Sequence, residues 1–188
     1  MRDEALKTLK GRVAEALVES IFRDAHYYVA RAGRESSVIR LPRKDSDDLP
    51  DFLVWRPAEN LGLDLHQLFM VEVKYRSDLA DFFLRFGGAE KLANAKQRWP
   101  DLYFVFVTDH PAADRSCFQA MCLRDYTPGE EPNLVDLHQL PALGIYPRTV
   151  AEHGALAQDL FAPLGSQQPS RRDAIAARRK VADRHPGS

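Results

Sequence analysis

The feature that most constrains the fold is an almost unbroken apolar run from Leu102 to Thr108. Such a run is typical of an inner strand covered on both faces, because a strand with one solvated face alternates apolar and polar residues. The run is also far shorter than the roughly 20 residues that a membrane span requires. We therefore expect a sheet with this strand in its interior, and no membrane segment.

The segments before this run have the patterns of a helix, three strands and a second helical stretch. Apolar residues from Leu6 to Phe22 recur every four residues and form one stripe, which predicts an amphipathic helix. Aromatic and β-branched residues predict the strands, and Gly87-Gly88 and Pro100 interrupt and end the later helical pattern. The expected elements are helix 6–22, strands 27–30, 51–55 and 68–75 (the last two able to pair as a hairpin), and helices 79–86 and 89–99, with Ser77 as an N-cap.

The pattern after the apolar run is weaker. Residues 116–123 are expected to add an edge strand, whereas 133–140 fit neither a helix nor a strand clearly. Thr149-Val150-Ala151-Glu152 has the form of a capping box and predicts a last helix that ends near Phe161. The order of elements indicates an α/β fold with a mixed central sheet flanked by helices.

Length and composition indicate one domain. A chain of 188 residues, 45% hydrophobic and 28% charged, can bury one sizeable core. We expect that domain to cover 1–162, with an exposed loop at 33–49 and a basic, flexible tail at 163–188. The N-terminus opens with charged residues instead of an apolar leader, so the expected location is cytoplasmic. The two cysteines, Cys117 and Cys122, indicate neither a disulfide framework nor a zinc site.

Charge gives a mixed indication about partners. The formal net charge of −1 provides no overall attraction for nucleic acid. The tail is different, because residues 171–188 contain six Arg and Lys residues against two Asp. Any phosphate binding must therefore depend on local patches.

Three polar residues mark the ends of two expected strands. Side chains two apart on a strand share a face, so Glu72 and Lys74 point the same way. Taken alone, this pair can be interpreted as a solvated salt bridge that contributes about 0–1 kcal/mol to stability. Asp51 changes the balance, because it stands at the start of the preceding strand and could lie within reach of Glu72. Two converging carboxylates repel unless a proton or a cation lies between them, and Mg²⁺ takes one or two carboxylates together with phosphate oxygens.

Pro50-Asp51 and Glu72-Val73-Lys74, in the order helix, three strands, helix, strand, resemble the PD-(D/E)XK nuclease superfamily over residues 6–108. The resemblance implies a restriction-endonuclease-like αβββαβ core and a Mg²⁺-dependent (or Mn²⁺-dependent) endonuclease. In that family the two acids and the backbone carbonyl between the second acid and the Lys bind metal, and the Lys orients or activates the attacking water. Carried over, these roles fall on Asp51, Glu72, the carbonyl of Val73, and Lys74.

Two further residues follow from the same resemblance. Lys10-Gly11-Arg12-Val13-Ala14-Glu15 is similar to the opening helix of archaeal Holliday-junction resolvases, which makes Glu15 a candidate metal ligand and catalytic acid. On the helix itself Glu15 is expected to border the packed face, and Glu19 to point more toward water. Several branches of the family also supply a polar residue from the helix after the Lys strand, and Gln97 is the nearest match, as a possible accessory residue.

The leading hypothesis is thus a nuclease that hydrolyses phosphodiester bonds, with DNA as the expected substrate by analogy with the family. A two-fold homodimer would be the simple geometry if both strands are cut. The alternative is a catalytically inactive nucleic-acid-binding or assembly module on the same fold. A small-molecule enzyme would need a phosphate loop or a nucleophile paired with a base, and neither pattern occurs in the sequence.

Overall fold

In the part of the chain that the structure describes, six strands form one sheet in which spatial order follows chain order, from β1 to β6. The computed structural model describes residues 2–32, 50–57, 66–85 and 87–165, so the expected loop at 33–49 and residues 166–188 of the expected tail lie outside the described residues. The strands are β1 (Tyr28–Arg31), β2 (Phe52–Pro57), β3 (His66–Tyr75), β4 (Tyr103–Val107), β5 (Phe118–Cys122) and β6 (Val135–Asp136). The expected α/β fold with a mixed central sheet is confirmed.

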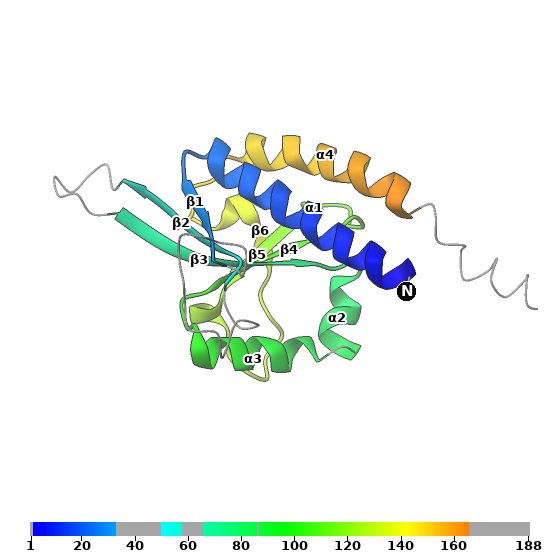
Figure 1. Ribbon diagram of the computed structural model, residues 1–188. Helices are drawn as coiled ribbons and strands as arrows, with labels where there is room; N and C mark the ends of the chain where they lie inside the picture. The colour runs from blue at the N-terminus through cyan, green and yellow to red at the C-terminus, as the bar shows by residue number, and fades with distance from the viewer. Residues whose placement is uncertain (1, 33–49, 58–65, 86, 166–188) are drawn as a thin grey trace, which may run out of the picture.

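The sheet is antiparallel except at its centre. β1, β2 and β3 form an antiparallel meander, and β4, β5 and β6 form another. The two meanders join through β3 and β4, which run parallel with Val73 opposite Val105. Parallel neighbours need a crossover connection. Here it consists of α2 (Leu79–Arg85) and α3 (Gly88–Arg98), which therefore lie against one face of the sheet (Figure 1).

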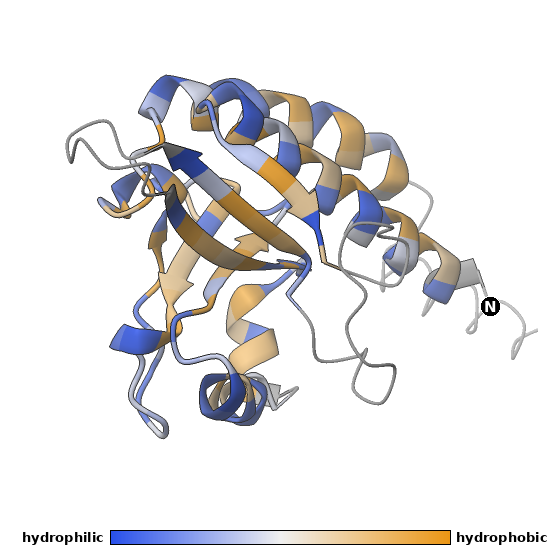
Figure 2. Cartoon of the chain, turned by 60° about the vertical axis from the view of Figure 1, so that its left-hand side comes forward, coloured by the Kyte–Doolittle hydropathy of each residue, from blue (hydrophilic) through white to orange (hydrophobic). Residues whose placement is uncertain are grey.

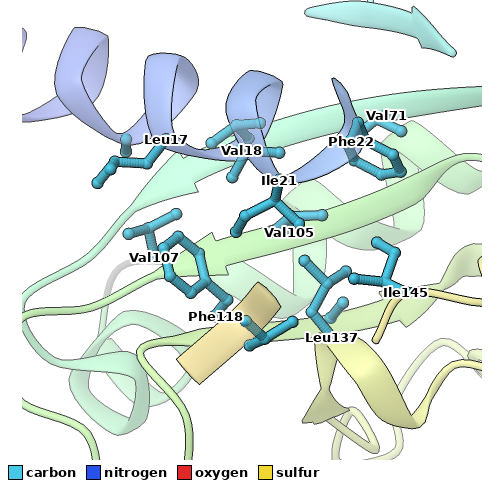
Figure 3. Packing of buried hydrophobic residues seen from close by; sticks show 14 of the residues in the cluster. Leu17, Val18, Ile21, Phe22, Val71, Val105, Val107, Phe118, Leu137 and Ile145 are labelled. Atoms are coloured by element: carbon cyan, nitrogen blue, oxygen red, sulfur yellow. The ribbon is translucent and has the colours of Figure 1, made fainter. Parts of the chain in front are cut away.

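The opposite face of the sheet is covered by the two longest helices, α1 (Arg2–Asp24) and α4 (Pro147–Gly165) (Figure 1). Both alternate between apolar and polar residues along their length, as expected of helices that pack through one face (Figure 2). Leu17, Val18, Ile21 and Phe22 of α1 point into the larger core, where they meet side chains of the inner strands and of the segments that follow β6 (Figure 3). The labelled partners are Val71, Val105, Val107, Phe118, Leu137 and Ile145.

A smaller core lies on the α2 and α3 side. It contains Phe82, Leu92, Phe104 and Phe106 among its buried members. β4 contributes to both cores, because alternate residues point to opposite faces. The interpretation of Leu102–Thr108 as an inner strand covered on both sides is therefore confirmed. None of the described helices is long and apolar enough to cross a lipid bilayer.

Several expected boundaries need correction. The helix after β3 is capped by Asp78, whose Oδ1 accepts the Asp81 N–H at 2.8 Å, and not by Ser77. α4 begins at Pro147, two residues before the expected capping box. Proline suits the first turn of a helix because its missing N–H has no partner there. The capping box that does form lies at Asp136 and Gln139.

β5 is a strand, as predicted, but it is not an edge strand. It lies between β4 and β6, and all five of its residues are buried. The edge position belongs to β6, a two-residue strand within the segment 133–140 that fitted no single pattern. So short a strand leaves no periodicity for a sequence to show. Both cysteines are free and buried.

Candidate active site

The site is built where β2 and β3 stop pairing. The antiparallel ladder ends with Phe52 opposite Val71, while β3 continues to Tyr75. One step further in the same register sets Asp51 opposite Glu72, on the face away from the larger core. The sequence indicated that Asp51 could lie within reach of Glu72 if their strands were adjacent, and the strands are adjacent in this register.

Asp51 extends the ladder by one hydrogen bond through its side chain. Its Oδ2 accepts a hydrogen bond from the Val73 N–H at 2.7 Å. Its backbone carbonyl accepts the Ala32 N–H at 3.0 Å, which ties the same residue to the end of β1. A carboxylate that accepts a backbone N–H is fixed in orientation. Asp51 is therefore held beside β3, next to the residue whose carbonyl is an expected metal ligand.

Glu72 and Lys74 form an ion pair with each other, between Glu72 Oε1 and Lys74 Nζ. Both point to the side of α2 and α3, because they lie opposite Phe104 and Phe106 of the smaller core. The Glu72 side chain is only 15% exposed. Burial, opposed by Lys74 and reinforced by the Asp51 carboxylate, raises the pKa of Glu72 to about 7. Two acids thus share a poorly solvated place with one ammonium group.

Glu15 reaches the same region from α1. Burial raises the pKa of Glu15, the charge of Asp51 raises it further, and the charges of Arg31 and Lys74 oppose the rise. Glu15 is also bound to Arg31 at 3.2 Å. Glu15 interacts with the charges of Asp51 and Lys74, whereas Glu19 is bound by two arginines. The Glu19 side chain is 20% exposed and that of Glu15 is 30%, because Arg23 and Arg31 both cover Glu19.

A cleft of about 540 Å³ opens between the end of β3 and α3. Gln97, the expected accessory residue, lines it together with Glu72 and Lys74. The cleft is rich in positive charge, since it holds four basic side chains and one acid. Its charged and amide side chains are Glu72, Lys74, Arg76, Lys91, Asn94, Gln97 and Arg98.

No known protein family matches the chain, and no curated protein sequence is significantly similar to it. The chemistry of the site therefore has to be argued from its own residues.

The arrangement suits a hard divalent cation by its donor set. Within the described ranges, no group of three or more His, Cys, Asp and Glu side chains is close enough together to hold a metal ion. Mg²⁺ does not require such a group, because it commonly binds through one or two carboxylates and completes its octahedron with water and phosphate oxygens. Asp51 and Glu72 supply two carboxylates from adjacent strands. Their mutual repulsion is relieved when a cation binds between them.

Arg76 is a site residue that sequence reasoning missed. It lines the cleft, its guanidinium lies 4.3 Å from the centre of the Phe82 ring, and its Nη1 donates to the carbonyl of Tyr75 at 2.6 Å. Burial lowers the pKa of Arg76. The signal was available, because Arg76 follows Lys74 by two residues and extends the same face of the chain.

A second polar cluster lies beyond the end of β3, on the side of α1. Lys10 Nζ donates to Asp109 Oδ2 and to the Tyr75 hydroxyl, both at 2.9 Å. The Lys10 and Asp109 side chains are 10% and 6% exposed. The two residues are 99 positions apart, so no local pattern could have predicted the pair.

Proposed function

We propose that this protein is a metal-dependent nuclease that hydrolyses phosphodiester bonds, with DNA as substrate. The observation that carries the proposal is the convergence of Asp51, Glu72 and Lys74 on one face where β2 and β3 separate. Glu72 and Lys74 also line the cleft that holds the basic side chains. Carboxylates for a cation, an ammonium beside them and basic side chains for phosphates are the groups that phosphodiester hydrolysis needs.

The order of elements supports the same proposal. α1, the meander β1 to β3, the helical crossover α2 and α3, and the parallel strand β4 follow the helix, three strands, helix, strand order of the PD-(D/E)XK superfamily. We propose on this basis that the chain has a restriction-endonuclease-like core. Pro50-Asp51 then begins the second strand of that core, and Glu72-Val73-Lys74 lies near the end of the third.

Asp51 and Glu72 would hold the cation, with the Val73 carbonyl and Glu15 as further oxygen donors. Such a cation lowers the pKa of a bound water and neutralises charge on the phosphate. Asp51 is fixed for this role by the Val73 N–H. Glu15 lies near enough to Asp51 for the two charges to interact, so it can accept a proton or hold a water of the metal's outer shell.

Lys74 is the residue best placed to act on the attacking water. Its ammonium is held by Glu72, 36% of its side chain remains exposed, and it lines the cleft. There it can donate a hydrogen bond that orients a water and stabilise the negative charge that develops on the phosphate oxygens. Arg76 and Lys91 line the same cleft and can pair with phosphates on either side of the scissile bond.

The test is a cleavage assay with purified full-length chain and labelled DNA in Mg²⁺ or Mn²⁺. Lys74→Ala and Asp51→Ala should each lower the rate by roughly 100-fold or more, the range expected for loss of a group that acts in proton transfer or charge stabilisation. EDTA should stop the wild-type reaction. Matched controls are Lys7→Ala and Asp159→Ala, which remove exposed charges from α1 and α4. Undiminished cleavage by the Lys74 and Asp51 variants, with EDTA still inhibiting, would remove these residues from the mechanism.

A catalytically inactive nucleic-acid-binding module is the second candidate. One observation favours it, because both carboxylates already have partners within the protein. Asp51 accepts a hydrogen bond from the Val73 N–H, and Glu72 accepts one from Lys74. On this alternative the ion pair replaces a metal, and the basic cleft only binds phosphates. The two candidates differ in whether a divalent cation competes with Lys74 for Glu72.

A further inference from the structure

An exposed row of apolar side chains crosses β1, β2 and β3 on the face that carries the carboxylates. The register pairs Tyr28 with Trp55, and Trp55 with Leu68. Tyr28 is 57% exposed and Leu68 is 58% exposed. The rings of Tyr28 and Trp55 stack with centroids 5.8 Å apart and planes 21° apart. Trp55, between Tyr28 and Leu68, is partly exposed. Single exposed apolar residues are ordinary, but two of them with a partly exposed indole between them in one contiguous row indicate a binding surface.

This row, Tyr28-Trp55-Leu68, lies outside the packed interior of the molecule. Among the described residues, none of its three members belongs to either buried core or packs against one. The ends of β2 and β3 near residues 57 and 66 extend beyond both helical layers (Figure 1). The sheet therefore offers the row on a strand surface that the described helices leave uncovered.

The row leads directly to the proposed site. Two residues further along each strand, Ala30, Leu53 and Met70 lie opposite one another. The next step in the same direction reaches Asp51 and Glu72. Trp55 is separated from the acidic pair by four residues of strand, or about 13 Å at the usual rise per residue. A polymer with one unit at the acidic pair would thus have neighbouring units over the row.

We propose that Tyr28, Trp55 and Leu68 bind unpaired nucleobases of the substrate, so that the site acts on single-stranded segments. This inference rests on the proposed nuclease function and adds the class of substrate to it. Every base has a π-face that stacks on aromatic side chains, whereas bases in a duplex are stacked on each other. Proteins that bind single strands combine such stacking residues with a basic groove along the backbone. Here the basic groove is the cleft with Lys91 and Arg98.

A second copy of this chain is a weaker explanation for the row. A stable protein interface buries about 800 Å² on each partner. A row of three side chains beside an acidic pair is small by that measure. The stacked rings suit the bases of a nucleic acid. The basic residues and the carboxylates, with a bound cation, suit its phosphates.

The test compares binding of three labelled oligonucleotides of equal length in EDTA, where cleavage cannot occur: single-stranded oligo-dT, an abasic strand with the same phosphates, and a blunt duplex. The wild-type chain should bind oligo-dT about tenfold or more tightly than the abasic strand. Tyr28→Ala and Trp55→Ala should each remove about tenfold of that affinity and leave abasic binding unchanged. Tyr28→Phe should retain it. Tyr146→Ala, which removes a tyrosine that is 66% exposed at the start of α4, is the matched control.

Tryptophan emission gives an independent readout. The chain has two tryptophans, Trp55 and Trp99. In a Trp99→Phe variant, oligo-dT should quench the emission of Trp55 and the abasic strand should not. This measurement keeps the proposal testable if Trp55→Ala fails to fold.

Equal affinity for oligo-dT and the abasic strand would overturn the proposal. So would a Tyr28→Ala variant that changes the mass of the assembly while base-dependent binding stays intact, because the row would then be a contact between copies of the chain. Base-dependent binding without cleavage in Mg²⁺ would instead overturn the nuclease and leave the binding row in place. The two failures are therefore distinguishable.

Discussion

Asp51 connects three strands through a single residue. Its carbonyl accepts the N–H of Ala32, which follows β1, and its carboxylate accepts the N–H of Val73 in β3. Asp51 itself directly precedes β2. In the proposed role as a metal ligand, a carboxylate held in this way would need little reorganisation. The same contacts mean that Asp51 has a structural role that is separable from its charge.

Substitutions at Asp51 should separate these two roles. Asp51→Asn keeps an oxygen that can accept the Val73 N–H, so the free energy of unfolding should change by less than about 1 kcal/mol. Asp51→Ala leaves that N–H without its acceptor and should cost about 1–3 kcal/mol. Urea denaturation of both variants measures the difference. Equal losses of stability would show that the hydrogen bond to Val73 contributes nothing to the fold.

The Lys10–Asp109 pair should make stability depend on pH. Burial raises the pKa of Asp109, but hydrogen bonds from His110, Lys10 and Tyr75 outweigh it, so the folded-state pKa is lowered. A carboxyl with a lowered pKa stabilises the fold above its unfolded value of about 3.9, and this contribution is lost as the pH falls through the folded-state pKa. Because removing one partner leaves Lys10 as a buried, uncompensated charge, Asp109→Asn should cost about 3 kcal/mol at pH 7.

Chemical denaturation at pH 7 and at about pH 3 measures this effect. The deficit of Asp109→Asn should shrink toward the lower pH, because the unfolded chain takes up a proton at Asp109 below about 3.9 while the lowered pKa of the folded state resists it. Glu152→Gln, which breaks the exposed ion pair with Arg148 on α4, is the control and should leave the free energy of unfolding unchanged at both values. A deficit that is independent of pH would show that packing, and not charge, accounts for the role of Asp109.

At the scale of elements, the junction of α2 and α3 shapes the cleft. Gly87 adopts a left-handed conformation with φ 64°, and the next residue, Gly88, lies against the end of α2. A Cβ on Gly88 would come within 2.9 Å of the Phe82 carbonyl oxygen. Because a backbone atom cannot rotate away, only glycine allows α3 to start so close to α2. Phe82 in turn packs under Arg76 in the cleft wall.

Gly88→Ala should therefore destabilise the fold by about 1–3 kcal/mol, the usual cost of overpacking. Gly154→Ala in α4 is the matched control, since a Cβ there meets nothing within 4 Å. It should stabilise the fold by about 0.5–1 kcal/mol, because alanine is the better helix former. Thermal denaturation of the two variants checks the opposite signs. A neutral Gly88→Ala would show that the two helices can separate without cost.

The sequence predicts helices and strands that have a strong hydrophobic periodicity. It does not predict which residue caps a helix or which strand lies at the edge of the sheet. The stripe on α1 and the apolar run of β4 follow from burial alone, so both were predictable. The choice of Asp78 over Ser77 as a cap depends on backbone angles at the end of β3, and β5 loses its edge position to a two-residue strand. Neither feature leaves a pattern that the sequence displays.

The site was predictable to the same degree. The shared face of Glu72 and Lys74 follows from strand alternation, which is local information, whereas the register that sets Asp51 opposite Glu72 is not. The contact of Arg31 with Glu19 and the Lys10–Asp109 pair join distant segments of the chain. Arg31, for example, reaches Glu19 from β1, and nothing on the helix itself indicates that contact.

At the scale of the whole molecule, basic residues gather in two places, the cleft and the segment 171–188. The net charge is −1, yet four basic side chains line the cleft, and residues 171–188 add six more basic residues against two acids. Association with a polyanion should therefore depend on these local groups and weaken steeply with salt.

Truncation after Gly165 tests the contribution of the basic tail. The shortened chain should bind single-stranded DNA more weakly, and the slope of log K against log salt should become shallower by about 0.7 for each phosphate that the tail neutralises in the full-length chain. Fluorescence anisotropy across a salt series measures both quantities. The wild-type affinity and slope in the truncated chain would show that the tail does not bind phosphates.

Calorimetric titration with Mn²⁺ shows whether Asp51 and Glu72 share one cation, as we propose. The wild-type chain should bind Mn²⁺ at roughly millimolar concentration or below, through one or two carboxylates and several waters. Asp51→Asn, which keeps the fold, should abolish the heat of binding, while Asp159→Asn on α4 should leave it unchanged. Absence of Mn²⁺ binding by the wild-type chain, or undiminished binding by Asp51→Asn, would contradict the account.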